Sequence, residues 1–182
     1  MSDDGKDICF IHSGVVKSEI NGKNGKPLIL RLAGKGAVFG HRNIANIDFP
    51  KQTVTAVENL HICKLSTADF RRIADKSPNL QSEIIHSYLD EMKNLEIRAL
   101  DLAHKSVKQR IAGILLDISE IYQYSPGLKT IRINLSRQDL ASLAGTTKEQ
   151  VSTILAEFQK QKLLKFQAKH FKYFDLEGLR KI

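Results

Sequence analysis

The sequence predicts an α+β fold in which an antiparallel β-roll is followed by a long helix and then by a smaller, mainly helical unit. Three observations predict it. Residues 8–65 consist of short apolar or alternating runs separated by turn signals, as in antiparallel sheets. Residues 77–104 contain no helix breaker and repeat apolar residues in heptads. Residues 136–158 have the pattern of two short helices around a glycine.

The composition fits a soluble globular protein of one large or two small domains. The 182 residues are 42% hydrophobic and 26% charged, which is sufficient for a proper core. No apolar run is long enough to span a membrane, and the acidic start does not resemble a secretion signal. Cys9 and Cys63 lie 54 positions apart and form no metal-binding pair. These features predict a cytoplasmic protein with reduced thiols and no membrane partner.

Six strands are predicted before residue 66, with glycines at several of the turns. Asn21–Lys26 contains two Asn-Gly pairs, which tolerate the left-handed conformations of a tight hairpin. Strands this short and evenly spaced are typical of a compact antiparallel barrel or roll. The predicted strands are Ile8–His12, Val15–Ile20, Leu28–Leu32, Val38–Gly40, Thr53–Val57 and Ile62–Leu65.

Two helices follow the predicted roll. Ser66 caps a brief helix that ends near Ala74, and Ser77 caps a second one with Pro78 at its first position. The second helix continues to about His104, a length of about 40 Å. Its apolar residues step by three and four, which favours pairing with a second copy of the chain, although packing on the roll would use the same face. The seam consists of Ile85, Tyr88, Met92, Leu95, Ala99 and Leu102.

A break at residues 104–106 separates these elements from the second half of the chain. Ser106 or its neighbour begins a helix that Tyr124–Gly127 ends, and Thr130–Asn134 alternates as a short strand. The buried side of this helix consists of Val107, Ile111, Ile114, Leu115, Ile118 and Ile121. The predicted units are a β-roll at 1–76, a dimerisation helix at 77–104 and a third unit at 105–182.

Residues 136–158 carry the pattern of a helix-turn-helix. Ser136 and Thr147 each precede a helix as a cap, and a polar side chain three positions later can reach back to each cap. Gly145 lies between the helices, where the reversal needs a positive φ. The second helix of this motif enters the major groove, so the pattern predicts double-stranded DNA as a partner. A tight helical hairpin without a nucleic-acid role would have similar features.

A β-hairpin directly after this motif would form the wing of a winged helix. Its predicted strands are Leu163–Phe166 and Phe171–Leu176. The hairpin contains Lys165, Lys169 and Lys172, which are suited to contacts with the phosphate backbone.

The distribution of charge supports a nucleic-acid partner for the third unit. Residues 105–182 hold 14 Lys and Arg against 7 Asp and Glu, a balance of +7, whereas residues 1–104 hold 14 against 13, a balance of +1. Nearly all of the net charge of +8 therefore lies beside the helix-turn-helix, as expected if that unit neutralises phosphates.

The sequence does not predict an enzyme. It contains no Gly-rich phosphate loop, no nucleophile elbow and no His/Cys set with metal spacing. The competing class is a ligand-sensing regulatory module that acts through protein–protein contacts, with the winged helix as its docking surface. Duplex DNA binding that weakens steeply with salt would distinguish a DNA-binding regulator from such a module.

Several motifs resemble those of one family. The strongest are Arg110–Asp117 and Leu135–Gly145, and Phe10–Gly14, Gly36–Gly40 and Phe174–Arg180 are also similar. With the order of roll, long helix and winged helix, the chain resembles the Crp/Fnr family of bacterial transcription regulators over nearly its whole length. The resemblance implies a cyclic-nucleotide-binding-like jelly roll and a homodimer that binds a palindromic operator and recruits or blocks RNA polymerase.

By position in the motif, the resemblance implies that the start of the second helix contacts base edges. Lys148 stands where the family often has arginine, and Glu149 matches the usual glutamate, which can accept from a cytosine amino group. Ser152 and Thr153 lie one turn further on. Several relatives carry a second arginine at the position of Thr153, so a different half-site is expected here. Ser136 and Thr147 are expected to be caps that also touch phosphate, and Arg137 and Lys169 are further DNA-binding candidates.

The resemblance leaves the effector unidentified. Cyclic-AMP-binding members have a glutamate after the glycine of their phosphate cassette and an arginine-serine pair further on. Here Gly40 is followed by His41 and Arg42, and Lys51 lies near the later position, so cyclic AMP is not expected and no cofactor is predicted. These four residues are the candidate site for another anion.

Two other features of the family bear on the sensor. Iron–sulfur sensing needs several clustered cysteines, which two distant ones do not supply. Family members also begin with a helix and one or two strands before the counterpart of Ile8, so the first part of the N-terminal domain is expected to be lacking.

Overall fold

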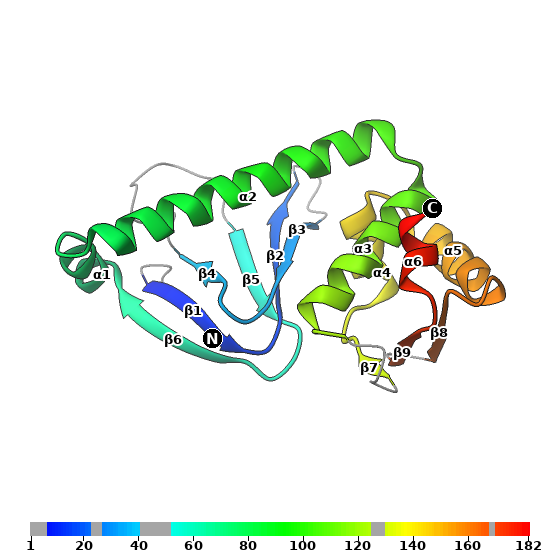
Figure 1. The fold of residues 1–182 in the computed structure, drawn as a ribbon, viewed down its shortest axis with the longest axis horizontal. Coiled ribbons are helices and arrows are strands. Elements are labelled where there is room, and N and C mark those ends of the chain that lie inside the picture. Colours follow the sequence, from blue (N-terminus) through cyan, green and yellow to red (C-terminus); the bar gives the residue numbers. More distant parts are fainter. Residues whose placement is uncertain (1–6, 23–26, 41–51, 125–129, 168–169) are drawn as a thin grey trace.

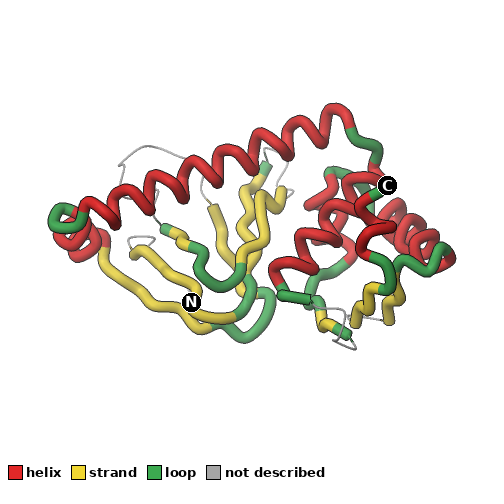
Figure 2. Tube along the Cα trace, in the orientation of Figure 1, coloured by secondary structure: helices red, strands yellow, loops and turns green. Residues whose placement is uncertain are grey.

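The computed structural model describes residues 7–22, 27–40, 52–124, 130–167 and 170–182. Figure 1 shows a long helix, α2, that passes over a group of strands and ends above a second group of elements, which contains the C-terminus. The strands of the first half gather on one side of the molecule, and most of the short helices gather on the other (Figure 2). The part of the chain described here contains no helix that is long and apolar enough to cross a membrane.

The first half forms two three-stranded antiparallel sheets, in the orders β4-β1-β6 and β3-β2-β5. All six predicted strands are confirmed, with ends shifted by at most one residue. Ile11, Val16, Ala33 and Phe39 form the buried apolar cluster of this half, and Ile8 and Ile29 are buried as well. The strands are β1 (Asp7–Ser13), β2 (Val16–Asn21), β3 (Pro27–Ala33), β4 (Val38–Phe39), β5 (Gln52–Ala56) and β6 (His61–Ser66).

The predicted hairpin at Asn21–Lys26 joins β2 to β3, which pair antiparallel with Asn21 opposite Pro27. Residues 23–26 themselves lie outside the described part of the chain.

The two cysteines cannot bond to each other in this fold. On the paired strands β1 and β6, Cys9 lies opposite Lys64, whereas Cys63 lies opposite Phe10. Neighbouring register positions point to opposite faces of a sheet, so the two sulfurs are on different sides.

The helices α1 (Thr67–Ala74) and α2 (Pro78–His104) confirm the predicted starts and ends. The Ser66 hydroxyl accepts from the Asp69 amide at 3.0 Å, and the Ser77 hydroxyl accepts from the Leu80 amide at 3.3 Å. Within the described chain, no residue of α2 is buried, although many are apolar. A 27-residue helix with this composition has an apolar face without a partner in the single chain.

The second half contains a helix-turn-helix flanked by a small three-stranded sheet of order β7-β9-β8. The winged architecture is therefore confirmed. A core of apolar residues, including Leu115, Leu140, Val151, Leu155 and Phe158, joins its helices. The elements are α3 (Val107–Ile121), β7 (Ile131–Arg132), α4 (Arg137–Ala144), α5 (Lys148–Lys160), β8 (Leu164–Gln167), β9 (His170–Tyr173) and α6 (Leu176–Arg180).

Two predicted boundaries are wrong. The strand expected over Thr130–Asn134 is two residues long. The strand expected over Phe171–Leu176 ends at Tyr173, because the Asp175 side chain accepts from the Gly178 amide at 2.7 Å and starts the short helix α6.

The predicted cap at Ser136 is confirmed in full, whereas at Thr147 only the bond from the cap side chain is present. Ser136 accepts from the Asp139 amide at 3.0 Å, and the Asp139 carboxylate accepts from the Ser136 amide at 2.8 Å, a complete capping box. Thr147 accepts from the Gln150 amide at 3.3 Å, but the Gln150 side chain bonds the Thr146 hydroxyl instead of reaching back to Thr147.

The strand β2 is linked to the helix-turn-helix by an ion pair. Lys17 Nζ lies 2.7 Å from Asp139 Oδ1, and both side chains are mostly buried. Burial opposes the charge on each group, but the hydrogen bonds outweigh it: contacts with Lys17 and Ser136 hold the pKa of Asp139 below its ordinary value. Contacts with Asp139 and Glu19 raise the pKa of Lys17 in the same way.

This pair predicts a loss of stability in acid. A carboxylate with a lowered pKa stabilises the folded state above its ordinary pKa, about 4, and that contribution disappears as the pH falls through the lowered value. Lys17 is charged throughout this range. Between pH 7 and pH 3 we expect wild type to lose about 1–2 kcal/mol more than Asp139→Asn. Urea unfolding of both proteins at the two pH values measures the difference, and equal losses would contradict the role of Asp139.

Candidate nucleic-acid interface

The helix α5 has one face in the core and one in solvent. Val151, Leu155 and Phe158 are fully buried and hold the helix against α3 and α4. The predicted base-contacting residues lie on the opposite face and are all exposed: Lys148, Glu149, Ser152 and Thr153. The structure thus brings these four residues together on one accessible surface.

Lys148 and Glu149 lie at the exposed start of α5. Their charged atoms are 3.7 Å apart, and the side chains are 64% and 68% exposed. An ion pair this exposed contributes little to stability, so both groups are free to exchange it for other partners. Ser152 and Thr153 donate their hydroxyls to the backbone oxygens of Lys148 and Glu149, at 2.9 and 3.1 Å. Each hydroxyl oxygen can still accept a hydrogen bond.

The two predicted phosphate contacts at helix starts are exposed but already act as caps. The Ser136 hydroxyl donates to Asp139 Oδ2 at 2.6 Å, and the Thr147 hydroxyl accepts from Gln150. The first backbone amides of α4 and α5 remain the natural donors for an anion, because they have no partner within the helix.

Arg137 lies against the wing. Its guanidinium carbon is 4.6 Å from the Phe166 ring centre and 5.6 Å from the Phe171 ring centre. These rings face each other across β8 and β9, where Phe166 and Phe171 are paired in register. The contact fixes the wing relative to the start of α4. Sequence reasoning listed Arg137 as a DNA contact and missed this role.

The wing carries two lysines side by side. Lys165 on β8 is directly opposite Lys172 on β9, and both are exposed. Like charges in a directly opposed pair repel each other, so a bound phosphate would relieve the repulsion. Lys169, the third lysine predicted here, lies outside the described residues.

The predicted dimer seam is largely exposed to solvent in the single chain, and part of it lines a cavity. Ile85 is 59% exposed and Met92 is 52% exposed, whereas Tyr88 is half-buried. Ala99 is also exposed. Leu95 and Leu102 line a cavity. Leu102 also lies close to Gly145: a Cβ built on Gly145 would be 2.8 Å from a methyl group of Leu102.

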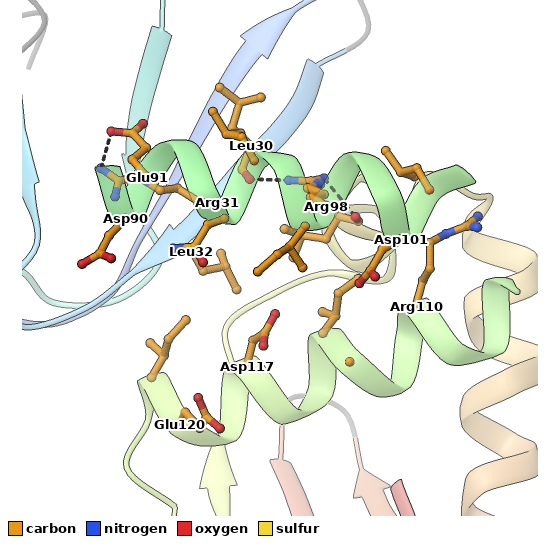
Figure 3. Close-up of a pocket in the computed structure, with 18 of the residues that line it drawn as sticks. Leu30, Arg31, Leu32, Asp90, Glu91, Arg98, Asp101, Arg110, Asp117 and Glu120 are labelled. Carbon is orange, nitrogen blue, oxygen red and sulfur yellow. Dashed lines mark hydrogen bonds and ion pairs between the residues drawn. The ribbon is translucent and has the colours of Figure 1, made fainter. Parts of the chain in front are cut away.

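This cavity, of about 770 Å³, lies between α2, α3 and β3. Figure 3 shows Asp101 of α2 and Asp117 of α3 pointing into the space between the two helices. Desolvation by the surrounding chain, reinforced by Glu120 and Asp101, raises the pKa of Asp117. The cavity was not predicted, because its lining comes from segments far apart in the sequence.

The candidate effector site is described only at Gly40. Its φ of +81° and its closeness to β1, where a Cβ would lie 2.0 Å from the Asp7 oxygen, account for glycine at this position. His41, Arg42 and Lys51 lie outside the described residues. In the described ranges, no group of His, Cys, Asp and Glu is arranged to hold a metal ion.

Gly145 has the predicted left-handed conformation, with φ of +60°. It leads α4 into α5, and the positive φ accounts for glycine here, while a Cβ would also require the Leu102 side chain to move.

Comparison with known proteins agrees with this architecture. The Crp-like helix-turn-helix domain matches residues 109–182, and the cyclic nucleotide-binding domain matches residues 2–77. The chain is 26% identical over 183 residues to the fumarate and nitrate reduction regulatory protein of Yersinia pestis, covering 99% of this chain and 72% of that protein. It is 26% identical over 173 residues to the anaerobic regulatory protein of Haemophilus influenzae, covering 94% and 67%.

Solved structures share the fold. FixK2 from Bradyrhizobium japonicum superposes with a TM-score of 0.83 at 19% identity, covering 98% of this chain and 88% of that one. TTHB099, a transcriptional regulator of the CRP family from Thermus thermophilus, gives a TM-score of 0.81 at 17% identity, covering 99% and 89%. Two domain matches that together span most of the chain, the curated relatives and the shared fold lead to one conclusion: this chain belongs to the Crp/Fnr family of transcription regulators.

Proposed function

We propose that this protein regulates transcription as a homodimer that binds a two-fold symmetric operator. The feature that supports this most directly is α5, whose apolar face is locked in the core while its polar face is open to solvent. A helix held in this way can enter the major groove without any change in the core.

Within the groove, each polar residue of α5 has a chemically suitable partner. Lys148 can donate to the O6 and N7 atoms of guanine, and Glu149 can accept from the N4 amino group of cytosine. Ser152 and Thr153 are shorter and suit either donors or acceptors one turn further along. The first backbone amides of α4 and α5, with Lys165, Lys169 and Lys172 of the wing, would contact phosphates and set the register.

The exposed apolar face of α2 supports the dimer. Two copies packed through Ile85, Met92 and Ala99 would remove this face from water and place two α5 helices on one side of the assembly. Half-sites about 34 Å apart, one helical turn of DNA, would match that arrangement. Contact with RNA polymerase belongs to the same proposal, as does control by a small effector other than cyclic AMP.

The experiment begins by selecting bound sequences from a random DNA pool with the wild-type protein. Replacing Lys148 by alanine should then lower affinity for the selected site by about tenfold and relax the preference at the base pair that Lys148 contacts. Lys76→Ala is the matched control, because Lys76 is exposed and follows α1, far from α5 (Figure 1). Unchanged base preference in Lys148→Ala would refute the assignment of α5.

A titration at two salt concentrations tests the function itself. Phosphate contacts make the affinity fall steeply with salt, since each contact releases a counterion. Weak binding with little dependence on salt would instead favour a module that docks on proteins.

A further inference from the structure

Arg98 joins the roll, the long helix and the helix-turn-helix. It belongs to α2, and its Nη1 donates to the Leu30 oxygen on β3 (Figure 3). Its Nη2 donates to the Leu143 oxygen at 2.9 Å and to the Ser142 oxygen at 3.4 Å, both at the end of α4. One guanidinium on α2 therefore bonds two other elements, and the residues that it contacts lie 44 to 68 positions from Arg98 in the sequence.

The chemistry suits this position. The last carbonyls of a helix have no partner within it and carry partial negative charge, so a cation there is favourable. A second arginine, Arg110, donates its Nε–H to another of these carbonyls, the Ala144 oxygen, at 2.7 Å. Burial lowers the pKa of Arg98, but a guanidinium remains charged in proteins, so this side chain donates at every physiological pH.

The helix α4 is also attached to the edge of β3. The Ser142 hydroxyl accepts from the Ile29 amide at 2.9 Å and donates to the Pro27 oxygen at 3.2 Å. Together with the pair between Lys17 and Asp139, these bonds hold α4 against the roll along its length. A shift of β3 or of α2 must therefore move α4 or break these bonds.

The position of α4 decides that of α5. The two helices share a buried core and are joined by a short turn at Gly145, which Leu102 of α2 covers. The direction of α5 relative to α2 thus depends on how α4 is held.

We propose that Arg98 is a positioning residue for operator recognition: by bonding β3 and the end of α4 together, it fixes the direction of α5 relative to α2. In the dimer of the proposed function, on which this inference rests, the direction of α5 sets the distance between the two recognition helices. Arg98 therefore determines which half-site spacing the protein prefers.

The experiment measures affinity for the selected operator and for versions whose central spacer is one or two base pairs shorter or longer. The variants are Arg98→Gln and the matched control Arg72→Gln, an exposed arginine on α1 whose ion pair with Asp69 is local. We expect Arg98→Gln to bind the best-spaced operator roughly tenfold more weakly and to discriminate between spacings less by a similar factor. Arg72→Gln should keep the wild-type profile.

A wild-type spacing profile in folded Arg98→Gln would overturn the proposal, because a residue needed for folding alone would not alter spacing preference. If circular dichroism shows that Arg98→Gln is unfolded, Arg98→Lys decides in its place, since a lysine keeps the charge but lacks the forked donors that bond the Leu30 and Leu143 oxygens together. A flattened profile in that variant supports the inference, and an unchanged one overturns it. Failure of the wild-type protein to bind any duplex would instead refute the proposed function.

Discussion

Replacing Met92 by glutamate is expected to convert the protein to monomers and to remove tight binding to its operator. Met92 is 52% exposed in the single chain, in the middle of the apolar face of α2. In a two-fold dimer the substitution places two carboxylates in one apolar interface, and an unpaired buried charge costs about 3–5 kcal/mol. The dimer dissociation constant should rise roughly a thousandfold. Sedimentation velocity measures it, and fluorescence anisotropy follows operator binding.

The matched control is Lys93→Glu. Lys93 is exposed on the same helix, one residue further and about 100° round the axis. This change alters the net charge by more than Met92→Glu does, but it leaves the seam apolar. Lys93→Glu should remain dimeric. A Met92→Glu protein that is still dimeric would show that α2 pairs through another face or not at all.

Replacing Phe158 by alanine should unfold the DNA-binding half of the chain. Its side chain is 0% exposed at the centre of the core that joins α5 to α3 and α4. Removing a buried phenylalanine costs about 3–5 kcal/mol, a large share of the stability of a small domain. The chain has no tryptophan, and three of its four tyrosines lie after residue 104, so tyrosine fluorescence in urea reports mainly on this half.

Phe174→Ala is the control for this change, because the same side chain is removed at a position that is 53% exposed. The Lys172 ammonium lies 5.3 Å from the Phe174 ring centre, and the loss of stability there, this contact included, should stay within about 1 kcal/mol. Equal losses of stability in the two variants would contradict the central role of Phe158.

The fold was largely predictable because its signals are local. Turn residues bound each strand of the roll, and a serine cap with a following proline marks the start of α2 at Ser77. Gly145 needs no more than its own backbone conformation to end α4. The exception, α6, also has a local cause: the alternation of Phe171–Leu176 suggested a strand, and the capping side chain of Asp175 was overlooked.

The site was less predictable, because part of it depends on contacts between distant segments. The exposed face of α5 follows from helical periodicity, so Lys148 and Glu149 were placed correctly on it. The contact of Arg137 with Phe166 requires the wing to fold back onto α4. Arg98 lies beside Leu95 and Leu102 of the seam and lines the same cavity, but a charged residue in the sequence gives no sign of its partners on β3 and α4.

The attachment of Ser142 to β3 has a further consequence for the protein outside its complex with DNA. The strand β3 is at the border of its sheet, and the Ile29 amide points outward, where it would otherwise be available to a strand from another molecule. Instead, this amide donates to the Ser142 hydroxyl. Separation of the two halves would uncover this amide, and the roll would then present an edge strand open to pairing with another chain.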